Sequence, residues 1–352
     1  MLKTYQDFSP LQIQKTIKFL VMGIIPLDAL ITLSSTYTWG SIVILLLLLP
    51  GWILGRSMRV TLDHQEPGEA VVINEAFESL NTGLIHILNN EQNKWLESAL
   101  DQINNSDDLI NDLLNLSAET RRKLGNDLLG SDINPLQLTS GLVARHWTVA
   151  DAGRVLLILR SVLTDVQQAQ SIIKAYFQQG DESEVAAVTR ILIFFPNGET
   201  LKPYAREVGR TNSKPLFAAL AQYNPYPAKY YSEHEFNQLV LKALFLGIGI
   251  DPVMGLLQRA NLELSQMCED YIKERVAANR IIPSDIWLAL EPYASVEGEA
   301  LMISHLSNES PQERYYAVKA LLQQNPLTPE RQQLLNEHLQ VEKDPIIIAL
   351  FA

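Results

Sequence analysis

The sequence lacks most of the residues and motifs that common metal-dependent and nucleophilic enzymes require. Its single cysteine, Cys268, excludes an intrachain disulfide and any zinc site built from several cysteines. It contains no HExxH, CxxC, GxGxxG, Walker A or GxSxG motif. We therefore expect no metal and no cofactor. The absence of these motifs argues against the commonest metal-dependent, nucleotide-dependent and nucleophilic mechanisms.

Basic charge is also scarce. The chain of 352 residues has 28 Lys and Arg against 40 Asp and Glu, a net charge of -12. The charge is unevenly distributed: residues 1–60 hold five Lys/Arg and two Asp, a local net charge of +3, which leaves -15 for the remainder. A nucleic-acid-binding surface needs Lys and Arg to neutralise phosphates. An acidic body of this kind argues against a nucleic-acid partner.

Two long apolar runs, Phe19–Leu33 and Trp39–Leu54, lie near the N-terminus. Each has about 15 residues, fewer than the roughly 20 that span a bilayer upright. A short uncharged turn joins them, however, and Lys/Arg pairs flank both outer ends. This pattern predicts a transmembrane hairpin over residues 1–62 with both ends in the cytoplasm. The chain would then be held at the inner (cytoplasmic) membrane, with its C-terminal domain in the cytoplasm.

After the polar segment Thr61–Gly68, helical periodicity continues to the C-terminus, and no sustained period-two alternation indicates a strand. Short breaks rich in Pro, Asn and Gly separate the expected helices, as in antiparallel helix pairs. Ser310–Leu321 resembles the second helix of a HEAT repeat, and a further helix is expected from Thr328. We therefore predict an all-α fold: a helical-hairpin (HEAT-like) solenoid over residues 70–352, preceded by the two-helix membrane hairpin.

Several helix boundaries can be predicted from capping residues and apolar spacing. Thr148, followed three residues later by Asp151, predicts an N-cap and a relative of the capping box. Asn261 is expected to cap a helix over Leu262–Asn279. Further helices are predicted over Ser117–Asp127, Lys214–Gln222 and Ser232–Leu246.

Polar residues recur inside the apolar frame of Asn224–Trp287 and just before it. The candidate ligand-binding or polar-network residues are Arg210, Asn212, Asn224, Tyr226, Asn237, Lys242, Arg259, Asn261, Asp270, Glu274, Arg275 and Arg280. Asp270 and Glu274 lie one turn apart, so their carboxylates repel and need a nearby cation if they are buried. We expect Lys242 or one of the arginines to supply it in a single network, which is either structural, a ligand site or a solvated face.

Other candidates have interpretations of their own. Gln238 and Lys242 lie one turn apart and off the apolar stripe of their helix. Lys242 is therefore expected to lie on a solvated face, to form a salt bridge or to hold an anionic group of a ligand. Asn212 is expected to cap the next helix or to help bind an anion. Asn224-Pro225-Tyr226-Pro227 indicates a rigid extended loop, which terminates a helix or projects Asn224 and Tyr226 into a groove.

An ordered series of short sequences carries a family resemblance. NPYP, beginning at Asn224, is followed by FNQLVLKALF, then GLxxRANxEL, then DYxxERxAAxRxxPxxxW, ending at Trp287. This series resembles the EboA family of bacterial metabolite-traffic proteins. The resemblance implies a helical protein from a gene group that moves a secondary-metabolite precursor out of the cytoplasm, and it implies no assigned reaction.

The N-terminal region has a resemblance of its own. LQIQKTIKFLVMGIIPLDAL, the second apolar run and RSMRVT together resemble the last two helices of a UbiA-type membrane prenyltransferase. Such enzymes hold a prenyl diphosphate through magnesium and two aspartate-rich motifs, which this chain lacks. The resemblance therefore implies that the chain does not perform the transfer alone.

These observations predict a non-catalytic helical scaffold or binding protein in secondary-metabolite precursor traffic to the cell envelope. Its expected partners are other proteins of the same gene group, a small-molecule metabolite, and the membrane through residues 1–60. Two alternatives stay open. One is an isomerase- or hydrolase-type enzyme that uses Asp270, Glu274 and Lys242 in a concave pocket. The other is an assembly subunit that completes a UbiA-type prenyltransferase.

Overall fold

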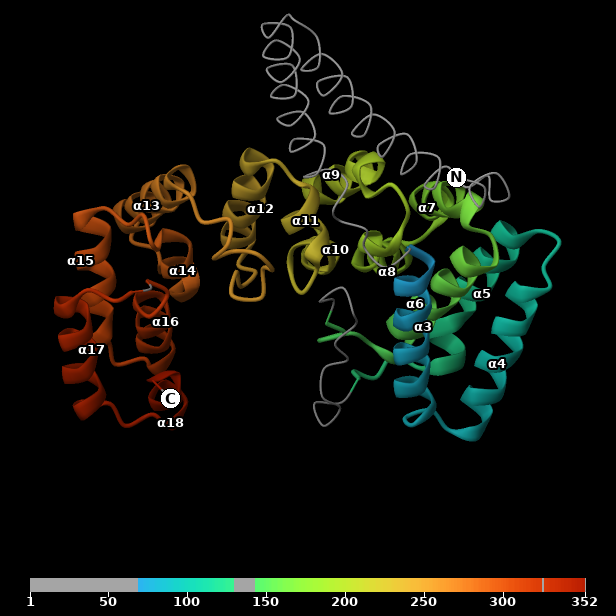
Figure 1. Cartoon of the computed structure of the whole chain (residues 1–352), viewed down its shortest axis with the longest axis horizontal. Coiled ribbons are helices and arrows are strands. Elements are labelled where there is room, and N and C mark those ends of the chain that lie inside the picture. The colour runs from blue at the N-terminus through green and yellow to red at the C-terminus, as the bar shows by residue number, and fades with distance from the viewer. Residues whose placement is uncertain (1–68, 130–142, 325, 352) are drawn as a thin grey trace, which may run out of the picture. The chain divides into compact units, whose positions relative to one another are not determined.

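The computed structural model describes residues 69–129, 143–324 and 326–351 (Figure 1). These residues form helices joined by short loops, and within them the only extended pairing is an isolated antiparallel bridge between Leu128 and Thr148. The predicted all-α class is confirmed. All of these helices belong to one compact unit, Glu69–Ala352.

The described helices vary from single turns to five turns. The α-helices are α3 (Glu69–Ile85), α4 (Asn90–Asn104), α5 (Leu109–Leu124), α6 (Val149–Thr164), α7 (Ala169–Gln179), α8 (Glu182–Arg190), α9 (Lys202–Arg210), α10 (Lys214–Ala221), α11 (Pro225–Tyr230), α12 (Glu233–Leu246), α13 (Leu262–Ala277), α14 (Trp287–Leu290), α15 (Val296–Ser304), α16 (Pro311–Leu321), α17 (Pro329–Val341) and α18 (Pro345–Ile348). The 3₁₀ helices are η1 (Val166–Gln168), η2 (Leu192–Phe194), η3 (Gly198–Leu201), η4 (Ser284–Ile286), η5 (His305–Ser307) and η6 (Ala349–Phe351).

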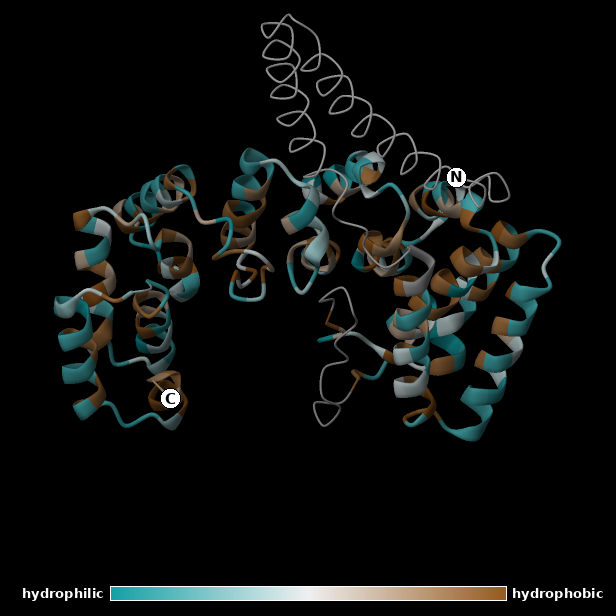
Figure 2. Cartoon of the chain, viewed as in Figure 1, coloured by the Kyte–Doolittle hydropathy of each residue, from teal (hydrophilic) through white to brown (hydrophobic). Residues whose placement is uncertain are grey.

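Helix α6 is the centre of the N-terminal part of this unit, and α3, α4 and α5 pack against it (Figure 1). Its sequence is apolar on nearly all sides, and almost every residue from Val149 to Val162 is buried. A helix that is hydrophobic all round can be stable only when other helices cover it. Along α4 and α17, by contrast, hydrophilic and hydrophobic stretches alternate, as expected for helices with one face in solvent (Figure 2).

The following helices continue the packing along the chain. Helix α10 contacts α8, α9 and α12, and α12 contacts α13. In the C-terminal part, α14 contacts α13 and α16. Two charged pairs link residues within this C-terminal part. Arg331 donates to Glu291 through Nη1 and Nη2, both at 3.0 Å. Arg314 donates to Glu342 through Nε and Nη2, at 2.7 and 2.9 Å.

The helix starts follow the predicted caps. The Thr148 hydroxyl accepts from the backbone N–H of Asp151, whose carboxylate accepts in return from the N–H of Thr148, which completes a capping box. Asn261 caps α13 by accepting from the N–H of Leu264 at 2.9 Å. Ser232 and Glu235 form a further capping box at the start of α12.

Two local predictions are wrong. Ser117–Asp127 is not a separate helix, because its first residues are the last two turns of α5, where Ser117 and Thr120 are buried. Asn224–Pro227 is not an extended loop. Asn224 caps α11, and Pro225 stands at the first helical position, where its missing N–H costs nothing.

The predicted membrane hairpin, residues 1–62, and its resemblance to a UbiA-type enzyme lie outside the described residues. Within the described ranges, no helix has both the length and the apolar character needed to cross a bilayer. The HEAT-like solenoid and the division into segments 1–62 and 70–352 stay predictions.

Candidate functional site

A cavity of about 500 Å³ opens between α9, α10 and α12, beside the end of α11. Its lining residues are Arg206, Gly209, Arg210, Phe217, Tyr231, His234, Glu235, Gln238, Leu239 and Lys242. The volume lies in the range of small-molecule sites, roughly 300–1,000 Å³. Phe217 and Leu239 are buried and supply an apolar floor.

Two polar groups meet at Gly209 in this cavity. The Nζ of Lys242 donates to the carbonyl oxygen of Gly209 at 2.8 Å. A methyl group placed on Gly209 would lie 3.7 Å from the hydroxyl oxygen of Tyr231, so this hydroxyl lies beside the same residue. Lys242 Nζ also lies 5.2 Å from the centre of the Phe217 ring. The ammonium group is therefore held by a carbonyl and an aromatic face at the edge of the apolar floor.

The hydroxyl of Tyr231 has no hydrogen-bond partner among the described residues, although the residue is only 7% exposed. Burial raises the pKa of Tyr231 above its ordinary value of 10, so the group is a neutral O–H donor. A buried donor without an acceptor costs free energy. This hydroxyl, whose oxygen is buried, would gain a hydrogen bond from an acceptor that comes within reach of it.

The charge of the cavity is positive. Its carboxylate, Glu235, is already engaged, because it accepts from Arg206 Nε at 2.5 Å and from the N–H of Ser232 at 2.8 Å. Burial alone would raise the pKa of Glu235, but these hydrogen bonds outweigh it and lower the pKa to about 2. Lys242 and Arg210 form no ion pair among the described residues. Desolvation lowers the pKa of Lys242, which indicates that its charge is poorly hydrated in the free protein.

The comparisons with known proteins give one match. Residues 76–291, more than half of the chain, match the sequence model of the family described as metabolite traffic protein EboA. The chain belongs to the EboA family. A comparison with curated proteins and one with solved structures found no match. The cavity at Lys242 lies wholly within the residues that match the EboA family.

Of the residues predicted from the sequence, only Arg210 and Lys242 line this cavity, together with Gln238. Asn212 is exposed, and Ser213, the next residue, caps α10 in its place. Asn224 and Tyr226 are fully buried and do not project into a groove. The side chain of Asn224 donates to the carbonyls of Thr189 and Ala219, and the Tyr226 hydroxyl donates to the carbonyl of Gly198 at 2.7 Å.

Three further candidates lie where α11, α12 and α13 meet. Asn237 and Asn261 bond each other through both amides, with N–O distances of 3.1 and 2.9 Å. Arg259 donates through Nη1 to the carbonyls of Pro227 and Ala228, and its guanidinium lies 4.5 Å from the centre of the Phe236 ring. Desolvation lowers the pKa of Arg259. These contacts hold the helices together.

The expected single network around Asp270 and Glu274 is not formed. Both residues are exposed, and Asp270 pairs with Lys273 on its own helix at 3.0 Å. Arg275 donates to the carbonyl of Ile281, and Arg280 is exposed in the loop after α13. Exposed carboxylates need no buried cation, and Lys242 bonds the carbonyl of Gly209 instead. Asp270, Glu274 and Lys242 therefore form no cluster that could act as an acid–base site.

Sequence reasoning missed most of the cavity. Arg206 and Arg210 lie four residues apart on α9, the same spacing that singled out Gln238 and Lys242 on α12. That spacing could have indicated a second polar face. Phe217 and Tyr231 resemble ordinary core residues in the sequence, and only the packing of α10 against α11 and α12 brings them to the cavity.

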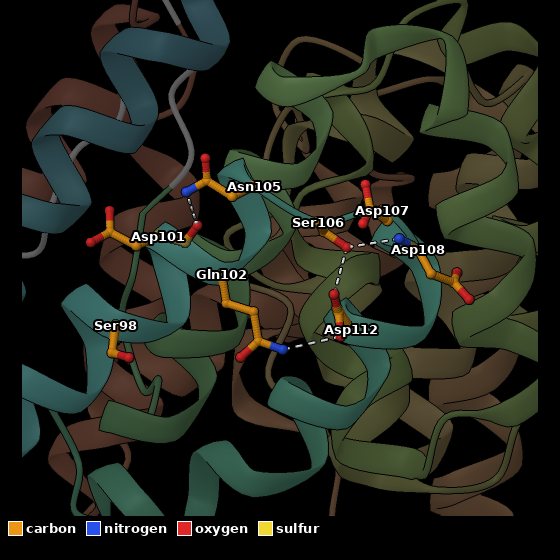
Figure 3. Close-up of a pocket in the computed structure, with 8 residues that line it drawn as sticks. All are labelled: Ser98, Asp101, Gln102, Asn105, Ser106, Asp107, Asp108 and Asp112. Atoms are coloured by element: carbon orange, nitrogen blue, oxygen red, sulfur yellow. Dashed lines mark hydrogen bonds between the residues drawn. The ribbon is translucent and has the colours of Figure 1, made fainter.

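A larger hollow of about 610 Å³ over the end of α4 and the start of α5 is a weaker candidate. Asp101, Asp107, Asp108 and Asp112 line it with neutral polar side chains (Figure 3). These groups bond one another: Asp112, for example, accepts from Gln102 at 3.0 Å. Among the described residues, no group of three His, Cys, Asp or Glu side chains is arranged to hold a metal ion.

Proposed function

We propose that this EboA-family protein is a non-catalytic binding protein that holds a small anionic metabolite in the cavity at Lys242. The observation that carries the proposal is that Lys242 Nζ, 5.2 Å from the centre of the buried Phe217 ring, and the unpartnered Tyr231 hydroxyl both lie beside Gly209. Lys242 and Arg210 would attract the anionic group, Tyr231 would donate to an acceptor, and the apolar floor would cover an aromatic or aliphatic body.

Binding is favoured over acid–base catalysis because the cavity's carboxylate, Glu235, is held by Arg206 and by the cap of α12. The family description, a metabolite traffic protein, supports a carrier or scaffold role. We further propose that residues 1–62 hold the chain at the cytoplasmic face of the membrane, where it passes the metabolite to partner proteins. This part of the proposal rests on the flanking Lys/Arg pairs of the sequence alone.

Calorimetric titration with a simple aromatic anion tests the cavity. The full chain is titrated with 2-naphthoate and with its neutral analogue 2-naphthamide. We expect the naphthoate to bind more tightly, and Lys242→Gln to weaken it by about tenfold while leaving the amide unchanged, which corresponds to the loss of one charge-assisted contact. Lys273→Gln is the matched control, because it removes the same charge from an exposed site on α13.

Two results would overturn the proposed site. One is equal affinity for the acid and the amide in the wild type. The other is equal weakening by Lys242→Gln and Lys273→Gln, which would indicate only general screening of charge. A parallel purification of the wild type and both variants from membranes of the source cells, followed by mass spectrometry of small molecules and proteins, identifies the natural ligand and partners. The proposal expects an anionic compound that Lys242→Gln alone loses.

A further inference from the structure

A second cavity, of about 520 Å³, lies between the C-terminal end of α5, the N-terminal ends of α6 and α8 and the start of α10. It shares no lining residue with the cavity at Lys242. Arg121, Arg154 and Arg190 supply its positive charge, and Asp151, Asp181 and Glu182 supply its negative charge. Whether it can bind an ion therefore depends on which of these charges already have partners.

The three acids are engaged by the protein itself. Asp151 pairs with Arg190 at 3.0 Å and accepts from the N–H of Thr148 in the capping box. Asp181 caps α8, where it accepts from the N–H of Glu184 at 2.9 Å and from the hydroxyl of Ser183 at 2.7 Å. Glu182 accepts from the hydroxyl of Ser213 at 2.6 Å. Asp151 also balances the charge of Arg190, although the Nη1 of Arg190 makes no hydrogen bond in this geometry.

Arg154 is different, because it is buried and only partly bonded. It is 3% exposed, and its Nε donates to the carbonyl of Ser117 at 3.2 Å. Among the described residues, its Nη1 and Nη2 have no hydrogen-bond acceptor, and no carboxylate lies within ion-pair distance. A buried guanidinium normally has its N–H groups satisfied. The residue lines the cavity, so an acceptor placed there can reach these nitrogens.

We propose that this cavity binds a small oxyanion, a carboxylate or a phosphate group, gripped by the Nη1 and Nη2 atoms of Arg154. A planar guanidinium matches two oxygens of either group in a bidentate arrangement. Arg121, exposed at the rim in the last turn of α5, adds a second positive charge. The N-terminal ends of α6 and α8 favour negative charge at the same place. The site is independent of the proposed function at Lys242.

Thermal unfolding of the full chain at fixed ionic strength tests this site, with sodium phosphate or sodium acetate replacing sodium chloride. We expect at least one of the two oxyanions to raise Tm in the wild type and in Lys242→Gln, which leaves this cavity intact. Arg154→Gln should abolish the rise. Arg121→Gln should weaken the apparent affinity about tenfold, as expected for loss of one charged contact.

Arg122→Gln is the matched control, because Arg122 is the exposed neighbour of Arg121 and pairs with Glu119 outside the cavity. It should leave the shift unchanged. Equal effects of Arg121→Gln and Arg122→Gln would overturn the proposal, as would a full shift in Arg154→Gln or no shift with either oxyanion in the wild type. If Arg154→Gln does not fold, the comparison of the two rim variants still decides. Loss of the shift in Lys242→Gln alone would place the bound ion in the other cavity.

Discussion

Tyr226 and Tyr231 lie edge to face with ring centroids 6.5 Å apart, yet only one of their two hydroxyls has an acceptor. The Tyr226 hydroxyl donates to the carbonyl of Gly198, and the Tyr231 hydroxyl has no partner among the described residues. Both side chains are buried. The pair therefore contrasts a hydroxyl that has an acceptor in the fold with one that has none.

Removing the two hydroxyls should have different effects on stability. Tyr226→Phe leaves the buried carbonyl of Gly198 without its donor, so we expect a loss of about 1–2 kcal/mol. Tyr231→Phe removes a buried donor that has no acceptor, so the unfolding free energy should be unchanged or slightly higher. Denaturant unfolding of both variants measures this. A clear loss of stability in Tyr231→Phe would mean that its hydroxyl has a partner in solution.

The same two variants separate stability from binding. If the Tyr231 hydroxyl donates to a ligand in the cavity at Lys242, Tyr231→Phe should weaken binding of 2-naphthoate several-fold while the melting curve is unchanged. Tyr226→Phe should bind with the same affinity as the wild type, once its smaller folded fraction is taken into account. Calorimetric titration of both variants is the measurement, and equal affinities in all three proteins would remove Tyr231 from the proposed site.

Asn224 should be among the most sensitive polar residues of the chain. It is 1% exposed, donates to the carbonyls of Thr189 and Ala219, and accepts from the N–H of Tyr226 at 3.0 Å. Asn224→Ala removes all three bonds, of which the one from Tyr226 is the cap of α11, so we expect a loss of about 3 kcal/mol. The exposed Asn212→Ala is the control and should change stability by less than about 0.5 kcal/mol. Chemical denaturation that ranks the two equally would contradict this assignment.

Much of the fold could be predicted from local sequence. The caps at Thr148, Ser232 and Asn261 depend on neighbours within three residues, and the apolar run of α6 can be satisfied only by burial. The wrong prediction of a separate helix from Ser117 also came from local sequence. Its surroundings are polar in sequence, but its side chain is buried where α5 packs against α6, which is a tertiary contact that no local pattern contains.

The candidate site was predicted less well, for a related reason. Lys242 and Gln238 were singled out because helical spacing places them together on one helix. Which residues face them is decided by how α9 and α10 approach α12, which depends on packing over the whole unit. The Asp270–Glu274 pair shows the converse. The spacing is real, but both residues lie on the solvent side of α13, where neither needs a partner.

A comparison of an exposed carboxylate, Glu274, with a buried one, Glu342, directly tests how burial decides whether a carboxylate needs a partner. Glu274→Ala should change the unfolding free energy by less than about 0.5 kcal/mol, because the residue is exposed and makes no ion pair among the described residues. Glu342→Ala should cost about 3–5 kcal/mol, because it leaves the half-buried Arg314 without its bidentate partner. Thermal or urea unfolding distinguishes the two. A large loss in Glu274→Ala would restore the buried network that the sequence suggested.

The pair of Arg314 and Glu342 should also set part of the acid stability of the protein. Hydrogen bonds from Arg314 lower the pKa of Glu342 from its ordinary value of 4.5 to about 2. A carboxyl whose pKa is lower in the folded state stabilises the fold above its unfolded pKa, and this contribution is lost as the pH falls through the folded pKa. The stabilisation should therefore be complete above about pH 5 and disappear between about pH 4.5 and pH 2, a change of about 3 kcal/mol.

Glu342→Gln isolates this contribution, because it keeps the shape of the side chain and removes the titrating group. His338 Nε2 also lies 3.2 Å from Glu342 Oε2, so the substitution changes the surroundings of this histidine as well, and the two proteins are compared below about pH 5. There the difference in unfolding free energy between the wild type and Glu342→Gln should shrink steadily as the pH falls towards 2. Glu235, whose pKa is also about 2, titrates in both proteins and cancels in this difference. Urea unfolding at a series of pH values gives the two curves. Parallel curves down to pH 2 would mean that Arg314 does not hold Glu342 in its charged form.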